Sequence, residues 1–212
     1  MNLSIDFEKI KKEQIKLSES IILKDEFKKI EIIAAIDQTY VKEDVISHIV
    51  VCDYKTLKVI ETKTAVAKAP ISYKPGFLSY RELPAMVNAF IALKSKPDLI
   101  IVDGNGILHP RRLGIASHFG LVISKPTIGV ARNLVTGKVD KGKFYVENEL
   151  RGFEIKTKDH ATPIYVSPGH MISLGTALRI VTNCIRPPHK LPEPLHLAHR
   201  GARREMKEKL SK

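Results

Sequence analysis

The stretch Asp98-Leu-Ile-Ile-Val-Asp-Gly-Asn-Gly-Ile-Leu-His-Pro-Arg-Arg-Leu-Gly114 is the most informative part of the chain. Its apolar run from Leu99 to Val102 is typical of a strand that is buried on both faces. The strand ends in Asp103, and two glycines then let the backbone turn sharply and let a ligand approach. A buried strand that ends in Asp, followed by glycines and cations, often presents a metal to a phosphate in α/β enzymes. The same residues also fit a strand, an Asn-Gly turn and a helix with a basic outer face.

The composition is that of a globular protein. The chain has 212 residues, of which 43% are hydrophobic, enough for one well-packed domain over residues 1–212. Its two cysteines, Cys52 and Cys184, have no metal-ligand spacing and form no disulfide framework. No apolar run approaches the ~20 residues of a membrane span, and the first residues lack a signal-peptide pattern. We therefore expect a monomeric, cytoplasmic protein with no membrane partner.

The net charge of +12 is concentrated in the second half of the chain. Residues 1–106 hold 16 Lys and Arg against 15 Asp and Glu, whereas residues 107–212 hold 19 against 8. A strongly cationic half favours a polyanionic partner such as nucleic acid. A lysine-rich surface without such a partner is the alternative.

The hydrophobic periodicity predicts strands and helices in a recognisable order. Strands are expected over residues 32–40, 45–54, 57–67, 99–102, 127–131 and 164–167. Helices are expected over residues 7–29, 80–94, 110–120 and 174–184, with a basic helical tail over about 195–212. Residues 133–143 are polar and contain two glycines, which suits a turn or a hairpin.

This order is that of an α/β fold of the ribonuclease H-like type. Its mixed central sheet has antiparallel first three strands and is flanked by helices. In such a fold the first and fourth strands are neighbours, so Asp37 would lie beside Asp103. The adjacency follows from the expected fold and not from the spacing of the two residues.

Three carboxylates are candidate metal ligands. Asp37 interrupts the apolar run Ile32–Ile36, and a buried carboxylate is costly unless it meets a metal or a donor. Glu82 lies at an expected helix N-terminus, where interaction with the helix dipole is its simpler role. Together with Asp103 they offer the oxygen ligands that Mg²⁺ prefers, and such a metal activates water for phosphodiester hydrolysis. Three unrelated caps and salt bridges would produce the same pattern.

Other segments hold side chains suited to nucleic acid. One loop contains Tyr73 and Phe77, which would either stack on a base or pack beneath the loop. A helix beginning near Ser173 has N-terminal N–H groups that favour a phosphate, although capping of that helix is the simpler role of Ser173. His199 is a candidate metal ligand or proton-transfer group, or a surface residue of a basic helix.

In their order, these segments resemble the endonuclease V family, which nicks nucleic acid near deaminated adenine. The resemblance covers about residues 30–200, and its most specific part runs from Asp103 to His118. The other matching segments are Ala35-Ile-Asp37 with Tyr40, Tyr73-Lys-Pro-Gly-Phe-Leu-Ser-Tyr-Arg-Glu82, Pro126-Thr-Ile-Gly-Val-Ala131, Ser167-Pro-Gly-His170 and Leu191-Pro-Glu-Pro194.

The resemblance implies roles for the matching residues. Asp37, Glu82 and Asp103 would bind Mg²⁺, with Mn²⁺ as a substitute, and His199 would complete the catalytic group. Tyr73 would be the wedge that takes the place of the displaced base. The other implied substrate contacts are Gly76, Leu78, Gly104 and Ile115 at the lesion pocket, His109 and His170 near the cut strand, and Arg132 at a phosphate.

Two segments depart from the family's pattern. The wedge segment of the family is usually Pro-Tyr-Ile-Pro, whereas this chain has Ser72-Tyr-Lys-Pro75, which lowers the rigidity of the wedge and adds a cation. A lysine often follows the Ile-Gly-Val-Ala block, where this chain has Arg132. Arginine keeps the charge but changes the geometry of a phosphate contact.

The resemblance implies a metal-dependent DNA repair endonuclease that accepts a flipped hypoxanthine base. It would cut the second phosphodiester bond 3′ to the lesion in DNA containing deoxyinosine, leaving 3′-hydroxyl and 5′-phosphate ends. An inosine-specific endoribonuclease is one alternative, because the sequence does not settle how a 2′-hydroxyl is treated. A non-catalytic, basic nucleic-acid-binding module is the other.

Overall fold

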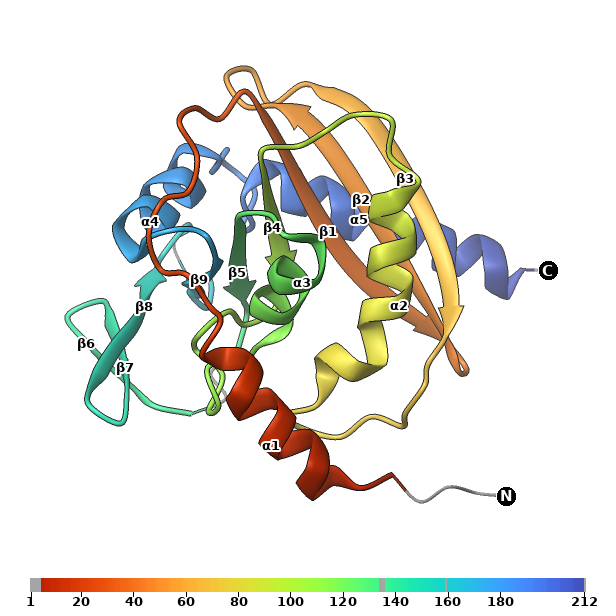
Figure 1. Ribbon diagram of the computed structural model, residues 1–212. Helices are drawn as coiled ribbons and strands as arrows, with labels where there is room; N and C mark the ends of the chain where they lie inside the picture. The colour runs from red at the N-terminus through yellow and green to blue at the C-terminus, as the bar shows by residue number, and fades with distance from the viewer. Residues whose placement is uncertain (1–4, 134–135, 159, 212) are drawn as a thin grey trace.

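The computed structural model describes residues 5–133, 136–158 and 160–211. In these residues, a nine-stranded sheet runs in the order β3-β2-β1-β4-β5-β9-β8-β7-β6 (Figure 1). Its first strands are β1 (Ile32–Val41), β2 (Asp44–Asp53), β3 (Val59–Lys68), β4 (Leu99–Asp103) and β5 (Thr127–Ala131). The others are β6 (Lys138–Asp140), β7 (Lys143–Val146), β8 (Glu149–Ile155) and β9 (Ile164–His170).

The sheet is mixed, as expected. Strands β1, β4 and β5 are parallel, and the remaining neighbours pair in antiparallel fashion, including β1 with β2 and β2 with β3. The predicted ribonuclease H-like α/β fold is therefore confirmed. Ile36 of β1 is in register with Val102 of β4, so Asp37 and Asp103 follow at the same edge of the sheet.

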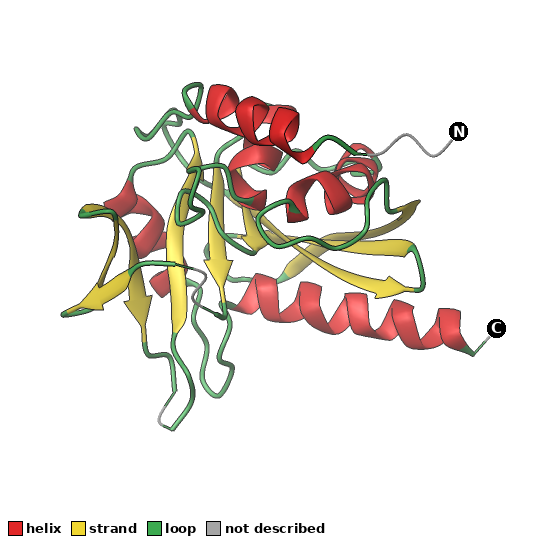
Figure 2. Cartoon of the chain, turned by 90° about the horizontal axis from the view of Figure 1, so that it is seen from below, coloured by secondary structure: helices red, strands yellow, loops and turns green. Residues whose placement is uncertain are grey.

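Helices cover both faces of the sheet. They are α1 (Phe7–Ser18), α2 (Leu78–Ile91), α3 (Ile115–Ile123), α4 (Leu174–Asn183) and α5 (Glu193–Leu210). Strand side chains alternate between two cores: Ile33 and Ala35 pack with α4 and α5, whereas Ala34 and Ile36 pack with α2 and α3. Figure 2 shows α5, which leads to the C-terminus, lying along one side of the strands. The same alternation turns Asp37 toward α5.

The N-terminal helix is shorter than the periodicity predicted, because it ends at Ser18 and not near residue 29. The chain after it makes tertiary hydrogen bonds in place of another helical turn. The Ile22 N–H donates to Nδ1 of His170 at 3.3 Å, and the carboxylate of Asp25 accepts from the Ser173 N–H at 2.7 Å. Contacts with distant residues therefore override local helical periodicity.

Two other boundaries differ from the prediction. The helix expected over 110–120 begins only at Ile115, and Arg112 before it adopts a left-handed φ of 56°, which is incompatible with a helix. The expected hairpin in 133–143 is found as β6 and β7, joined through Lys141 and Gly142, which both have positive φ. Residues 134–135 lie outside the described part. The strand β8 was not predicted.

The predicted basic tail is a core helix. Leu195, Ala198 and Ala202 of α5 are buried against the sheet. Gly201 allows a close approach, since a Cβ at that position would lie 2.2 Å from two ring atoms of His48 on β2. The predicted basic helix is confirmed, but it is not a free tail, because a narrow apolar stripe on one side of the helix packs against the sheet.

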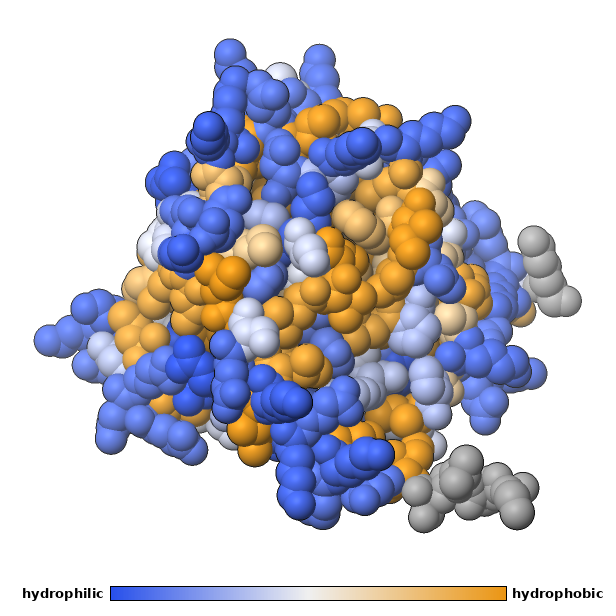
Figure 3. Space-filling model, in the orientation of Figure 1, coloured by the Kyte–Doolittle hydropathy of each residue, from blue (hydrophilic) through white to orange (hydrophobic). Residues whose placement is uncertain are grey.

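The outer surface over α1, α2 and α3 is mixed. Figure 3 shows hydrophilic side chains around the edge of this face and apolar side chains gathered toward its centre. Ile15, Ile91 and Val122 of these helices are exposed. Across the residues that the structure describes, no helix is both long enough and apolar enough to traverse a bilayer.

Candidate active site

Two aspartates and a histidine meet at the C-terminal edge of β1 and β4. Among the described residues, ligand atoms of Asp37, Asp103 and His199 all lie within 4.8 Å of one another. Nδ1 of His199 is 2.6 Å from Oδ2 of Asp37, whose Oδ1 accepts the backbone N–H of Gln38 at 2.7 Å. The structure thus brings together three of the four predicted catalytic residues from β1, β4 and α5.

Two carboxylates lie close together in this group, where little water screens the repulsion between their negative charges. Asp37 is buried, and the pKa of Asp103 is raised to about 8 because burial and the neighbouring Asp37 both penalise its charged form. Arg132 forms an ion pair with Asp103 and opposes that rise, and it lies 4.0 Å from Oδ2 of Asp37. A divalent cation would relieve the same repulsion, and the carboxylate oxygens are donors that suit Mg²⁺ or Mn²⁺.

Glu82 lies on α2, outside the group of three. It is buried, and its pKa is raised well above the usual range by burial and by the charges of Asp37 and Asp103. This coupling places Glu82 within electrostatic reach of the two aspartates, but its carboxylate oxygens do not join their 4.8 Å group. Direct metal ligation by Glu82 therefore stays a prediction.

A small cavity lies between the loop before α2 and the segment after β4. Its volume is about 120 Å³. Five predicted substrate-binding residues line it: Tyr73, Gly76, Leu78, His109 and Ile115. The remaining lining residues, which the sequence did not single out, are Pro75, Ser79, Asn105, Leu113 and Gly114. The cavity thus brings Gly76, Leu78 and Ile115, which the resemblance placed at the lesion pocket, together with Tyr73 and His109, to which it gave other contacts.

Gly104 supports this cavity without lining it. Its φ of +141° favours glycine, and a Cβ there would lie 2.5 Å from Cγ2 of Ile115. A larger residue at Gly104 would therefore displace Ile115, which does line the cavity.

The two aromatic residues of the loop have different environments. Tyr73 is 67% exposed, whereas Phe77 is 3% exposed and packs edge-to-face on Phe7, with 4.9 Å between ring centroids. The interpretation that the aromatics pack beneath the loop is therefore correct for Phe77 and wrong for Tyr73. Only Tyr73 is available to a ligand.

Protein groups bond part of the predicted phosphate site at the start of α4. The Ser173 N–H donates to Oδ1 of Asp25, and its hydroxyl accepts the Thr176 N–H at 3.3 Å. His170 is buried and accepts the Ile22 N–H. The Ser173 and Thr176 N–H groups are thus bonded within the protein, and the carboxylate of Asp25 adds a negative charge beside the start of α4, so a phosphate contact of Ser173 stays a prediction.

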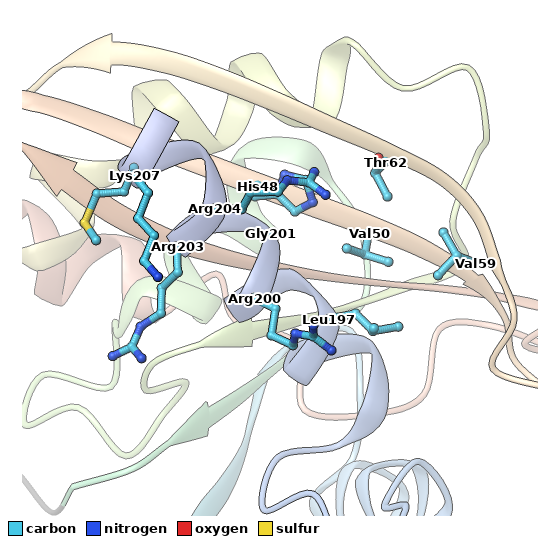
Figure 4. A pocket seen from close by; sticks show the side chains of 11 residues that line it. His48, Val50, Val59, Thr62, Leu197, Arg200, Gly201, Arg203, Arg204 and Lys207 are labelled. Carbon is cyan, nitrogen blue, oxygen red and sulfur yellow. The ribbon is translucent and has the colours of Figure 1, made fainter. Parts of the chain in front are cut away.

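A larger groove of about 800 Å³ lies between α5 and the strands β2 and β3 (Figure 4). The sequence pointed to the basic residues of α5 but not to this groove. Its apolar lining includes Val50, Val59 and Leu197, and its basic lining is Arg200, Arg203, Arg204 and Lys207.

The fold and the site together define a class of protein. A mixed sheet that holds carboxylates at the C-terminal edge of β1 and β4, beside a basic helix, is the arrangement of a ribonuclease H-like nuclease. A model of the endonuclease V family matches residues 15–200. The chain therefore belongs to the endonuclease V family, and the prediction of a nuclease rather than a pure binding module is confirmed.

Individual relatives agree with this assignment. Endonuclease V of Dictyoglomus turgidum is 41% identical over 206 residues, which cover 93% of this chain and 90% of the relative. The solved endonuclease V of Bacillus subtilis superposes with a TM-score of 0.87 at 28% identity, covering 98% of this chain and 95% of the other. Endonuclease V of Ciona intestinalis, solved with a 24mer DNA containing an inosine followed by a ribo-adenosine, has a TM-score of 0.86 at 29% identity, with coverages of 95% and 98%.

Proposed function

We propose that this nuclease is a metal-dependent repair enzyme that recognises deoxyinosine in DNA. It cuts the second phosphodiester bond 3′ to the lesion and leaves 3′-hydroxyl and 5′-phosphate ends. The supporting observation is that the small cavity and the acidic group are built on the same segment of the chain. Asp103 belongs to the acidic group, and Asn105, two positions later, lines the cavity. The inosine-containing DNA bound by the Ciona relative supports the choice of lesion.

The acidic group is the proposed metal site. Asp37 and Asp103 would hold Mg²⁺, or Mn²⁺ as a substitute, and Glu82 would contribute directly or through a water. A bound divalent cation supplies a Lewis acid that activates water and stabilises charge on the leaving 3′ oxygen. Asp37 orients His199 through Nδ1, which leaves Nε2 of the ring as the atom that takes up or delivers a proton.

The cavity is the proposed lesion pocket. A flipped hypoxanthine enters between the loop before α2 and the start of α3, against Gly76 and Ile115. Tyr73, exposed at the tip of its loop, fills the gap that the base leaves in the stack. Arg132, which pairs with Asp103 beside the acidic group, would contact a phosphate of the cut strand.

The test is cleavage of an end-labelled duplex with one deoxyinosine, beside the undamaged duplex, in the presence of Mg²⁺. A nick one nucleotide beyond the 3′ phosphate of the lesion supports the lesion, the reaction and the position together. The Ciona complex carries a ribo-adenosine after its inosine. Inosine-containing RNA is therefore the second substrate to test, and faster cutting of RNA than of DNA would favour the endoribonuclease.

Thermal unfolding tests the metal site independently of cleavage. A cation that binds only the folded protein raises the midpoint with increasing concentration. We expect Mg²⁺ and Mn²⁺ to raise the midpoint of the wild type but not that of Asp37→Asn. We also propose that residues 1–212 form one catalytic domain that acts as a monomer, which size-exclusion chromatography with light scattering checks.

A further inference from the structure

The loop that carries Tyr73 is held at its C-terminal side by three donors on one carbonyl. The carbonyl of Gly76 accepts from Nε2 of Gln14 at 3.0 Å and from Nη2 of Arg111 at 2.8 Å. Nε2 of His109 lies 3.1 Å from the same oxygen. These donors come from α1 and from the segment before α3, so three parts of the chain meet at Gly76.

The N-terminal side of the loop is also anchored. The carbonyl of Ile71 accepts from Nη1 of Arg81 at 2.8 Å. The guanidinium of Arg81 lies over the ring of Tyr40 on β1, 5.0 Å from its centroid. Tyr73 therefore projects from a short loop whose two sides are both fixed to regular elements.

Gln14 is the central residue of the C-terminal anchor. It is fully buried on α1, and both ends of its amide are used: Nε2 donates to Gly76, and Oε1 accepts from Nε of Arg111 at 2.6 Å. A buried amide is unfavourable unless its donors and acceptors are paired. The position therefore bridges the loop to the segment that supplies Arg111, which an apolar residue there would not do.

Aromatic and cation–π contacts also hold the Tyr73 loop against α1. The ammonium of Lys74 lies 3.6 Å from the ring centroid of Phe7 on α1, and Phe7 packs against Phe77. Lys74 and Ser72 are the positions where this chain departs from the Pro-Tyr-Ile-Pro pattern of the family. One of the two changed side chains thus contacts α1 directly.

We propose that α1 is a brace for the Tyr73 loop, with Gln14 as a positioning residue that holds the loop ready to enter duplex DNA. The inference rests on the proposed function, in which Tyr73 is the wedge. Proline restricts a loop through its own ring, and in this chain contacts with α1 supply that restriction. A loop that is already ordered loses less conformational entropy on entering the base stack.

The experiment compares duplex with single-stranded DNA, each containing one deoxyinosine, in single-turnover cleavage. A wedge is needed only where a base has to leave a duplex. We expect Gln14→Leu to slow duplex cleavage by about tenfold, the order of effect of one lost hydrogen bond at a buried group. Cleavage of the single strand should change little. Phe7→Leu should likewise slow cleavage of the duplex and not of the single strand. Lys12 is exposed on α1, and Lys12→Ala should cleave both substrates as the wild type does.

The outcomes separate this inference from the proposed function. Equal slowing of Gln14→Leu and Phe7→Leu on both substrates, or no slowing on either, would overturn the brace while wild-type cleavage stands. A wild type that cuts neither substrate would overturn the proposed function and the brace with it. If thermal unfolding shows that Gln14→Leu does not fold, the comparison of duplex with single-stranded cleavage by Phe7→Leu tests the brace instead.

Discussion

The imidazole of His199 pairs with the carboxylate of Asp37 across 162 positions of the chain, with 2.6 Å between Nδ1 and Oδ2. This contact joins α5 to β1, and Asp103 from β4 completes the group. The position of α5 against the sheet therefore sets the geometry of the proposed metal site, and changes at the α5–β2 contact should reach it.

Gly201→Ala tests that dependence. A Cβ would lie 2.2 Å from ring atoms of His48, which Thr64 holds through a 2.8 Å hydrogen bond. Overpacking of this kind costs about 1–3 kcal/mol, which exceeds the ~1 kcal/mol that alanine adds to helix propensity. We expect lower thermal stability and slower single-turnover cleavage. The double variant Gly201→Ala/His48→Ala should regain both, and a single variant as stable as the wild type would contradict the close approach.

Asp103→Asn separates catalysis from folding. The substitution removes a proposed metal ligand, so cleavage of inosine-containing DNA should be abolished while binding in a gel-shift assay is largely retained. It also removes the repulsion between Asp103 and Asp37 that raises the pKa of Asp103, so the unfolding midpoint without metal should rise. Retained cleavage would refute the assignment of this site.

Two buried histidines should make the protein less stable in mild acid. Burial lowers the pKa of His109 and of His118 to about 4, from 6.5 in the unfolded chain. Between these values the unfolded state binds more protons than the folded state. The free energy of unfolding therefore falls as pH drops from about 6.5 toward 4, by up to about 1.4 kcal/mol per pH unit for each histidine.

Denaturant unfolding at pH 7, 6 and 5 checks this effect. His118→Gln should flatten the pH dependence, because it removes one of the two groups that titrate differently in the two states. His160→Asn, at an exposed position, is the matched control and should leave the slope unchanged. A wild-type stability that is constant from pH 7 to 5 would rule out the effect.

Arg203 is expected to bind a phosphate of the substrate. It follows His199 by four residues on α5, which places both on one side of the helix, and Figure 4 shows Arg203 and Lys207 projecting in the same direction. Within the described residues Arg203 forms no ion pair, whereas Arg204 lies 3.6 Å from Glu205 and 3.9 Å from Glu208.

Arg203→Ala should therefore weaken binding of inosine-containing DNA and reduce the slope of log affinity against log salt by about 1. Arg204→Ala, which removes an equal charge already paired within α5, should change the slope less. The expectation fails if the two variants have the same slope, or if Arg203→Ala loses cleavage without losing affinity.

Local patterns in the chain were sufficient for the central strands and for the residues that end them. The apolar run Leu99–Val102, followed by glycines, favoured a buried strand with Asp103 at its end, and the structure confirms it. Ser173 begins its helix as predicted, since a hydroxyl cap acts on N–H groups two or three residues away. Such features depend on interactions between near neighbours, which sequence patterns record.

What the sequence by itself determined is an α/β chain with acids at strand ends, a basic second half and the segments typical of endonuclease V. Only the tertiary structure decided that α5 is a core helix whose His199 reaches Asp37, that Asp25 bonds the start of α4, and that Gln14 holds the Tyr73 loop. Each of these contacts joins residues more than 60 positions apart. The physical reason is that such contacts depend on how whole helices and strands pack against one another. Local hydrophobic periodicity indicates which residues form a helix or a strand, but not which distant residues these elements contact.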